Sequence, residues 1–124
     1  MAYAQTVKVV TGDTLPEVTV GLKDSNKAAT GKTLDAADNT TWAPIDITGA
    51  TVKLRIREVA STTIIKTITM TITDATNGKA ATDFPSDTWT KAGVFEGEVE
   101  ITFSDGGIQT LYDLIKFTVR SDFD

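Results

Sequence analysis

The sequence predicts an all-β protein, a sandwich of two packed antiparallel sheets with about seven strands. Threonine is in clear excess, at 23 of 124 residues, and its branching at Cβ favours extended backbone. Apolar residues recur at every second position in most stretches between turn signals, as they do in half-buried strands. No segment supplies the roughly dozen residues that an independent helix needs. A lone sheet would leave its apolar face in water, so two sheets are expected to cover each other.

One domain accounts for the whole chain, residues 1–124, and its core is expected over about residues 6–120. A folded chain of 13.3 kDa exposes roughly 6,400 Å² against about 19,000 Å² when extended, so about two-thirds of its surface can be buried. The sequence has no internal repeat and no shift in composition that would mark a second domain. A core can therefore form without cross-links.

The first half of the chain contains three predicted strands. Residues 6–10 form the first, and the break Thr11-Gly12-Asp13 separates it from the second, at residues 17–23. The third covers residues 51–58, TVKLRIRE, where apolar residues alternate without interruption with threonine, lysine and arginine. Each of these strands therefore has one face for the core.

A fourth strand, at residues 63–73, contains an irregularity. One phase of the alternation holds Ile64, Ile68, Met70 and Ile72. Ile65 is out of step with them, which predicts either a β-bulge or two halves that are covered differently. The segment Asp74–Gly78 is a strong turn because Asn-Gly readily adopts positive φ, and a short weak strand at residues 79–84 can follow it.

The clearest signal is a long hairpin at the end of the chain. Residues 94–103 alternate apolar residues and a glycine with glutamate and threonine. The sequence Ser-Asp-Gly-Gly at residues 104–107 then turns the chain into a return strand at residues 108–120.

The segment Asp24–Asp46 interrupts this series of strands. Structureless connections of this length are uncommon in compact domains unless they have a function, so the segment is a candidate interaction loop. A small extra hairpin or an edge strand that caps the sandwich with Trp42 is an equally good interpretation.

The sequence lacks the side chains that most enzymes use. It has no cysteine and no histidine, which excludes disulfides, thiolate zinc sites, a cysteine nucleophile and the commonest general base. Carboxylate pairs such as Asp35 with Asp38 do not match a calcium-loop spacing. Glu96 and Glu100 lie about 13 Å apart along a strand, too far for glycosidase chemistry. We expect no enzyme, no cofactor and no metal ion.

The charge balance argues against a nucleic-acid partner. The net charge is −5 and the pI is near 4.6, whereas binding to phosphate needs a positive field.

No apolar run approaches the roughly 20 residues that cross a bilayer, and the start, MAYAQTVKVV, lacks the features of a secretory signal. We therefore expect a soluble protein that is made without export and has no membrane partner.

Two rows of charge mark candidate interface residues. The basic row consists of Lys53, Arg55 and Arg57. The acidic row consists of Glu96, Glu98 and Glu100. If the two strands are neighbours in one sheet, the rows can pair across it. Alternatively, the charged face docks on a partner subunit, where complementary potentials fix the register.

Trp42 and Trp89 are the two tryptophans of the chain. In small sandwiches tryptophan more often plugs the end of the core, whereas an exposed tryptophan can stack on a sugar ring or anchor a protein interface. Trp42, two residues before Pro44 in the long segment, is the better interface candidate.

Four segments of the chain carry a resemblance to known proteins. They are GLKDSN at residues 21–26, IDITGATVKLRIRE at 45–58, ITDATNGKA at 72–80 and AGVFEGEVEITFSDGGIQT at 92–110. In this order they resemble the N-terminal immunoglobulin-like module of phage baseplate upper proteins and related small virion proteins, over roughly residues 18–119. The resemblance implies an immunoglobulin-like β-sandwich that holds other virion proteins and performs no catalysis.

The resemblance also implies a place and a set of partners. It points to a baseplate, tail or neck component, made in the host cytoplasm, that assembles with other virion structural proteins as a homo-oligomer or in many copies. The segment Asp24–Asp46, the termini Met1–Gln5 and Ser121–Asp124, and exposed strand edges would make the contacts. A capsid decoration protein of the same fold is the first alternative. A carbohydrate-binding module is the second, and a small hydrolase is a more distant rival.

Overall fold

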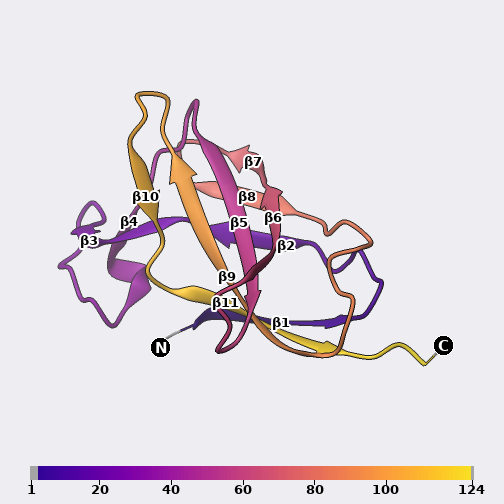
Figure 1. Ribbon diagram of the computed structural model, residues 1–124. Helices are drawn as coiled ribbons and strands as arrows, with labels where there is room; N and C mark the ends of the chain where they lie inside the picture. The colour runs from indigo at the N-terminus through magenta and orange to yellow at the C-terminus, as the bar shows by residue number, and fades with distance from the viewer. Residues whose placement is uncertain (1–2, 124) are drawn as a thin grey trace.

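Two β-sheets face each other across one hydrophobic core in the computed structural model, which describes residues 3–123 (Figure 1). The larger sheet runs in the order β1 (Tyr3–Val10), β11 (Leu114–Arg120), β9 (Gly93–Thr102), β5 (Thr51–Glu58) and β6 (Ile64–Thr69), and β10 (Ile108–Thr110) also pairs with β9. The smaller sheet runs in the order β2 (Val18–Gly21), β8 (Lys79–Thr82) and β7 (Thr71–Asp74). The predicted all-β sandwich is therefore confirmed.

The strand order is that of an immunoglobulin-like sandwich. In such folds strands B, E and D form one sheet, and strands G, F, C and C′ form the other. Here β2, β8 and β7 hold the first set of places, and β11, β9, β5 and β6 hold the second. The chain visits these places in the order that the immunoglobulin-like connectivity requires.

One pairing departs from the prediction of purely antiparallel sheets. Strand β1 runs parallel to β11, with Val7 opposite Phe117 and Val9 opposite Val119. After β1 the chain crosses to β2 in the smaller sheet, so β1 has no hairpin partner next to it in sequence. The C-terminal strand fills that place instead, and the larger sheet is mixed.

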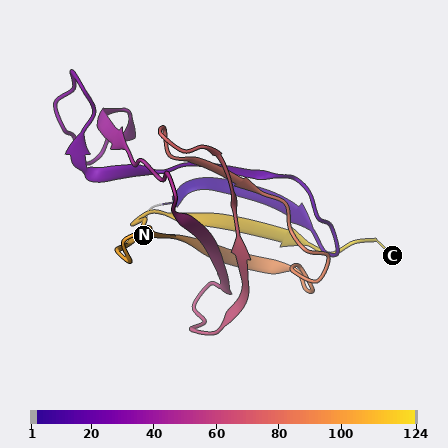
Figure 2. The same cartoon turned by 90° about the horizontal axis from the view of Figure 1, so that it is seen from above.

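The irregularity at Ile65 has both of the predicted forms. The register of β5 against β6 shifts between the pairs Ile56–Lys66 and Arg57–Ile64, so Ile65 is the extra residue of a bulge. The same extended segment then leaves the larger sheet at Met70 and continues as β7 in the smaller one. Seen from above, it crosses between the two layers at one side of the sandwich (Figure 2).

The core lies where the alternation places it. The largest fully buried side chains come from both sheets and their connections: Val18, Leu22, Ile47, Val52, Leu54, Ile56, Phe84, Trp89, Phe95, Ile101 and Phe117. Trp89 packs edge-on against Phe84 and Phe95, and its ring centroid lies 5.0 Å from that of Phe117. The prediction that tryptophan plugs the core therefore holds for Trp89, which is 1% exposed.

A third, two-stranded sheet stands apart from the sandwich. It pairs β3 (Lys23–Ala28) with β4 (Trp42–Pro44), and a 3-10 turn, η1 (Asn39–Thr41), precedes β4. The long segment of the sequence is thus the small extra hairpin of the second interpretation. Within residues 3–123, no helix has the length and hydropathy that a membrane-spanning helix requires.

Candidate functional site

The two charged rows lie on neighbouring strands of the larger sheet. Strand β5 pairs with β9 so that Arg57 is opposite Glu96, Arg55 is opposite Glu98, and Lys53 is opposite Glu100. The apolar residues between them point into the core, so alternation places both rows on the outer face. The structure therefore brings all six residues together on one surface.

Two ion pairs neutralise part of this surface. Arg55 Nη1 lies 2.7 Å from Glu100 Oε2, diagonally across the strands, and Arg57 Nε lies 2.9 Å from Glu96 Oε1. Hydrogen bonding to Arg55 lowers the pKa of Glu100, and the same bond raises the pKa of Arg55. These pairs are the cross-sheet pairing that the sequence predicts for neighbouring strands.

Glu96 is the centre of a small polar network. Glu96 is 8% exposed, and its second carboxylate oxygen, Oε2, accepts a 3.3 Å hydrogen bond from the Tyr3 hydroxyl. Burial, followed by the charge of Glu96 and this hydrogen bond, raises the pKa of Tyr3. Lys116 is opposite Glu96 on β11 and has its ammonium 5.8 Å from the centre of the Tyr3 ring.

Neither Tyr3 nor Lys116 is indicated as a site residue by the local sequence pattern. Tyr3 lies before the predicted first strand, and its neighbours depend on the parallel pairing of β1 with β11. That pairing joins opposite ends of the chain, and no local pattern in the sequence specifies it.

Lys53 and Glu98 have no ion-pair partner within 4.0 Å among residues 3–123. A shallow hollow of about 110 Å³ opens beside Glu98, and apolar atoms supply part of its lining. Its lining residues are Arg55, Ile56, Arg57, Thr62, Ile64, Glu96, Gly97, Glu98 and Leu114. The outer face thus combines an unneutralised carboxylate with partly apolar surface.

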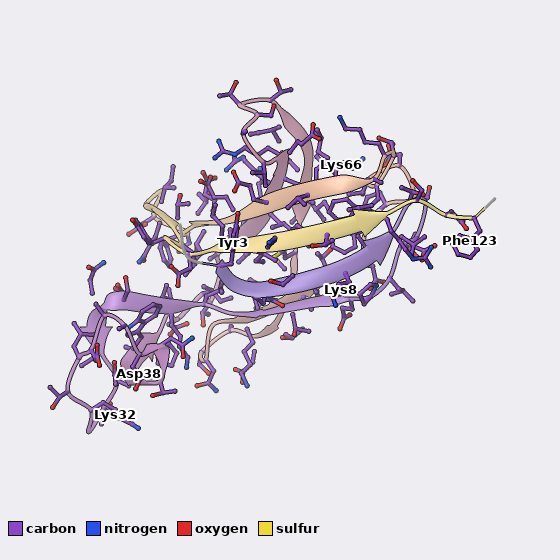
Figure 3. The ribbon with its side chains drawn as sticks, turned by 90° about the horizontal axis from the view of Figure 1, so that it is seen from below. Tyr3, Lys8, Lys32, Asp38, Lys66 and Phe123 are labelled. Carbon is purple, nitrogen blue, oxygen red and sulfur yellow. The ribbon has the colours of Figure 1, made fainter. Side chains whose placement is uncertain are left out.

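The hairpin of β3 and β4 and the loop between them form a projecting arm, residues 23–44. Figure 2 shows this arm reaching beyond the end of the sandwich, and Figure 3 places Lys32 and Asp38 far from Lys8 and Lys66 on the body. At its base the Leu22 N–H donates to Gly78 O at 2.7 Å, and the Ile45 N–H donates to Leu22 O at 2.9 Å. The loop residues 30–40 are exposed throughout.

Local polar contacts hold the arm in shape. The indole N–H of Trp42 donates to the carbonyl of Asp35 at 2.9 Å and so ties the two sides of the loop together. Asp38 caps η1 by accepting hydrogen bonds from the backbone and hydroxyl of Thr40, and these bonds lower the pKa of Asp38. Trp42 is half-buried against the arm, so part of its ring stays accessible.

The predicted contact regions at the chain ends lie in different environments. The Gln5 side chain of β1 donates to the carbonyl of Thr19 in β2 at 3.0 Å. Phe123 is 94% exposed at the end of the sandwich opposite the arm (Figure 3). Met1, Ala2 and Asp124, which belong to the predicted terminal contacts, lie outside the described residues.

The described residues offer few side chains for a metal site or a sugar-binding site. Within residues 3–123, no group of three or more acidic side chains could hold a metal ion. Asp35 and Asp38 accept hydrogen bonds from nearby residues in the arm, as solvated turn residues do. Stacking on a sugar needs an exposed tryptophan ring, and Trp89 is buried. Of the two tryptophans, Trp42 therefore remains as a candidate for binding a carbohydrate.

The chain matches no protein-family model and no curated protein. Among solved structures it is similar to murine CRIg, with 12% sequence identity and a TM-score of 0.38. That alignment covers 93% of this chain and 92% of the other. The immunoglobulin-like assignment rests on the strand order described above.

Proposed function

We propose that this protein is a non-enzymatic structural component of a phage virion that binds other virion proteins. The projecting arm is the observation that carries the proposal, because it presents residues 23–44 away from the core that stabilises the rest of the chain. The resemblance of four sequence segments to small virion proteins supplies the phage context.

The arm has the properties of a docking element. A two-stranded hairpin is marginally stable in water by itself, and this one depends on caps, turns and one indole hydrogen bond. Its exposed loop and the accessible part of Trp42 offer a partner both backbone groups and apolar surface. Binding loops on a rigid scaffold are a common arrangement for recognition.

The outer face of the larger sheet is a second contact surface in this proposal. Lys53 and Glu98 remain available for charges on a partner, and the flanking ion pairs neutralise the charges of Arg55, Arg57, Glu96 and Glu100. Complementary potentials at such a surface set the register of docking more than its affinity. This surface therefore orients the protein, while the arm engages the partner.

The position in the particle is the next part of the proposal. A baseplate, tail or neck position follows from the resemblance, with assembly in the host cytoplasm and several copies in each virion. A capsid decoration protein would use the same arm on a different lattice. Labelling purified particles with an antibody against this protein, followed by electron microscopy, distinguishes the two positions.

Deletion of the arm tests the proposal. A gene in which residues 27–42 are replaced by a short glycine-containing turn is expressed during particle production in place of the natural gene. We expect the deleted protein to fold, because none of these residues belongs to the buried core, and to be absent from purified particles. Substitution of exposed Thr71 by alanine in β7, which belongs to the smaller sheet and to neither proposed contact surface, is the control and should leave incorporation unchanged.

Two results would contradict the proposal. If the unaltered protein is absent from purified particles, the virion role is wrong. If the deleted protein is incorporated as well as the unaltered one, the role of the arm is wrong.

A further inference from the structure

The two sides of the sandwich differ in how their strand edges are protected. On one side, the Gln5 amide of β1 reaches across to the carbonyl of Thr19 in β2 and so occupies an acceptor on that edge. On the other side, β6 is the last strand of the larger sheet and pairs with β5 alone. The edge of β6 is therefore open, because this strand pairs on one side only.

The free backbone groups of β6 can be identified from its pairing. The Met70 N–H donates to Val52 O at 2.8 Å, so Met70 turns its backbone groups toward β5. In an antiparallel ladder every second residue does the same, and the residues between turn theirs away. Thr67 and Thr69 therefore present unpaired N–H and C=O groups at the open edge.

Strand β6 has few of the features that block strand addition. Its six residues, IIKTIT, include no proline, no glycine and one charge, Lys66. The ammonium of Lys66 lies 2.8 Å from Asp87 Oδ1 of the same chain, which neutralises it. Ile64 and Ile65, at the start of the strand, are 50% and 43% exposed and would gain cover from an added strand.

We propose that β6 pairs antiparallel with β6 of a second copy of this chain, about a two-fold axis at Thr67. Residues with outward backbone groups must face each other, and this axis places Thr67 opposite Thr67 and Ile65 opposite Thr69 of the second copy. An axis one residue earlier would instead place Lys66 opposite Lys66. Cross-strand threonine pairs are favourable, and β6 carries no carboxylate.

The distribution of charge also allows a second copy to occupy this edge. Each chain carries a net charge of −5, but the acidic row lies on β9, two strands away from the edge. The one charge that β6 itself brings to the seam is Lys66, which is paired with Asp87 of its own chain and lies opposite Ile68 of the second copy. The two larger sheets then become one continuous sheet. This inference deepens the assembly role proposed above, and its test uses the isolated protein, so its failure leaves incorporation through the arm separately testable.

Sedimentation of the purified full chain is the first test. We expect a concentration-dependent dimer between micromolar and millimolar protein. Thr67→Pro removes an outward N–H and should give a monomer, whereas Thr67→Ala keeps the backbone groups and should still dimerise. A natural chain that remains monomeric at every concentration, or a Thr67→Pro protein that still dimerises, would overturn the proposal.

Thr67→Lys keeps the test decisive if the proline variant fails to fold. It places two ammonium groups at the axis, so dimerisation should weaken and then recover at high salt. Unchanged dimerisation of this variant at low salt would place the interface elsewhere.

Cross-linking locates the axis, because the chain has no cysteine of its own. Paired residues in an antiparallel ladder have Cα atoms about 5.5 Å apart, within the range of a disulfide. Thr67→Cys should therefore give a covalent dimer under mild oxidation, at least tenfold faster than Thr118→Cys on the outer face of β11. Equal rates for the two variants would contradict the proposed axis.

Discussion

Gly97 shows how a single residue makes room for its neighbours in the core. It lies in the middle of β9 and faces the core, opposite Ile56 of β5. A Cβ at this position would lie 2.8 Å from Leu54 Cδ1 and 2.9 Å from the Phe117 ring. The glycine therefore leaves the room that these two buried side chains occupy.

We predict that Gly97→Ala destabilises the protein by about 1–3 kcal/mol, the usual cost of overpacking a closed core. The free energy of unfolding, measured with urea, tests this. Gly21→Ala is the matched control: nothing lies within 4 Å of its added Cβ, so a change within about 0.5 kcal/mol is expected. Equal effects of the two substitutions would show that the core accommodates the methyl group.

Individual residues differ in how far the sequence predicts them. Alternation predicts that Leu54, Ile56 and Val99 are buried, and all three are. Alternation does not predict the burial of Trp89, because this residue lies between strands. Its burial is expected only because tryptophan is often buried at the end of the core in small sandwiches. The contact of Tyr3 with Glu96 depends on a pairing across the whole chain, which no local pattern contains.

At the scale of elements, the arm and the sandwich are stabilised in different ways. The sandwich has a continuous apolar core, whereas the arm depends on capped turns and on the hydrogen bond from Trp42 to Asp35. Few buried contacts mean a low free energy of local opening. The arm should therefore open without unfolding of the sandwich.

We predict that Trp42→Ala exposes the arm to trypsin at Lys32 while the thermal unfolding midpoint stays almost unchanged. A net hydrogen bond is worth about 1 kcal/mol, so cleavage should be about fivefold faster. Trp42→Phe keeps an aromatic ring without the N–H and separates the hydrogen bond from packing. Cleavage at the natural rate in Trp42→Ala would mean that other contacts hold the loop.

The sequence predicts irregularities within a strand better than it predicts which strands pair. The bulge at Ile65 was visible because a residue out of phase is a local signal. The parallel partner of β1 was not visible. The phase break at Ile65 allowed for two differently covered halves, but it did not indicate that the segment changes sheet at Met70. Partner choice depends on which apolar faces meet in three dimensions, and alternation alone fits several pairings.

At the scale of the whole molecule, carboxylates determine how stability depends on pH. Hydrogen bonds from Thr40, Thr48 and Asn77 lower the pKa values of Asp38, Asp46 and Asp74, and those from Lys66 and Arg55 lower the pKa values of Asp87 and Glu100. The unfolded chain therefore takes up protons at higher pH than the folded chain. Stability rises with pH through this range.

We predict that the urea midpoint is flat between about pH 5 and 8, because the chain has no histidine. It should fall as the pH drops below the ordinary pKa values of 4.5 for glutamate and 3.8 for aspartate. Glu100→Gln removes one of the responsible groups and should lose less stability on acidification than the natural chain. A midpoint that rises on acidification would contradict this account.

The base of the arm joins both sheets. Strand β2 of the smaller sheet continues through Leu22 into β3, and β4 continues through Ile45 toward β5 of the larger sheet. A pull on the arm is therefore shared between the two layers. Because β2 and β3 follow each other nearly in line (Figure 1), that pull acts along the β2–β8 ladder and strains its hydrogen bonds together rather than in succession. A force applied to the arm would therefore meet the combined resistance of that ladder.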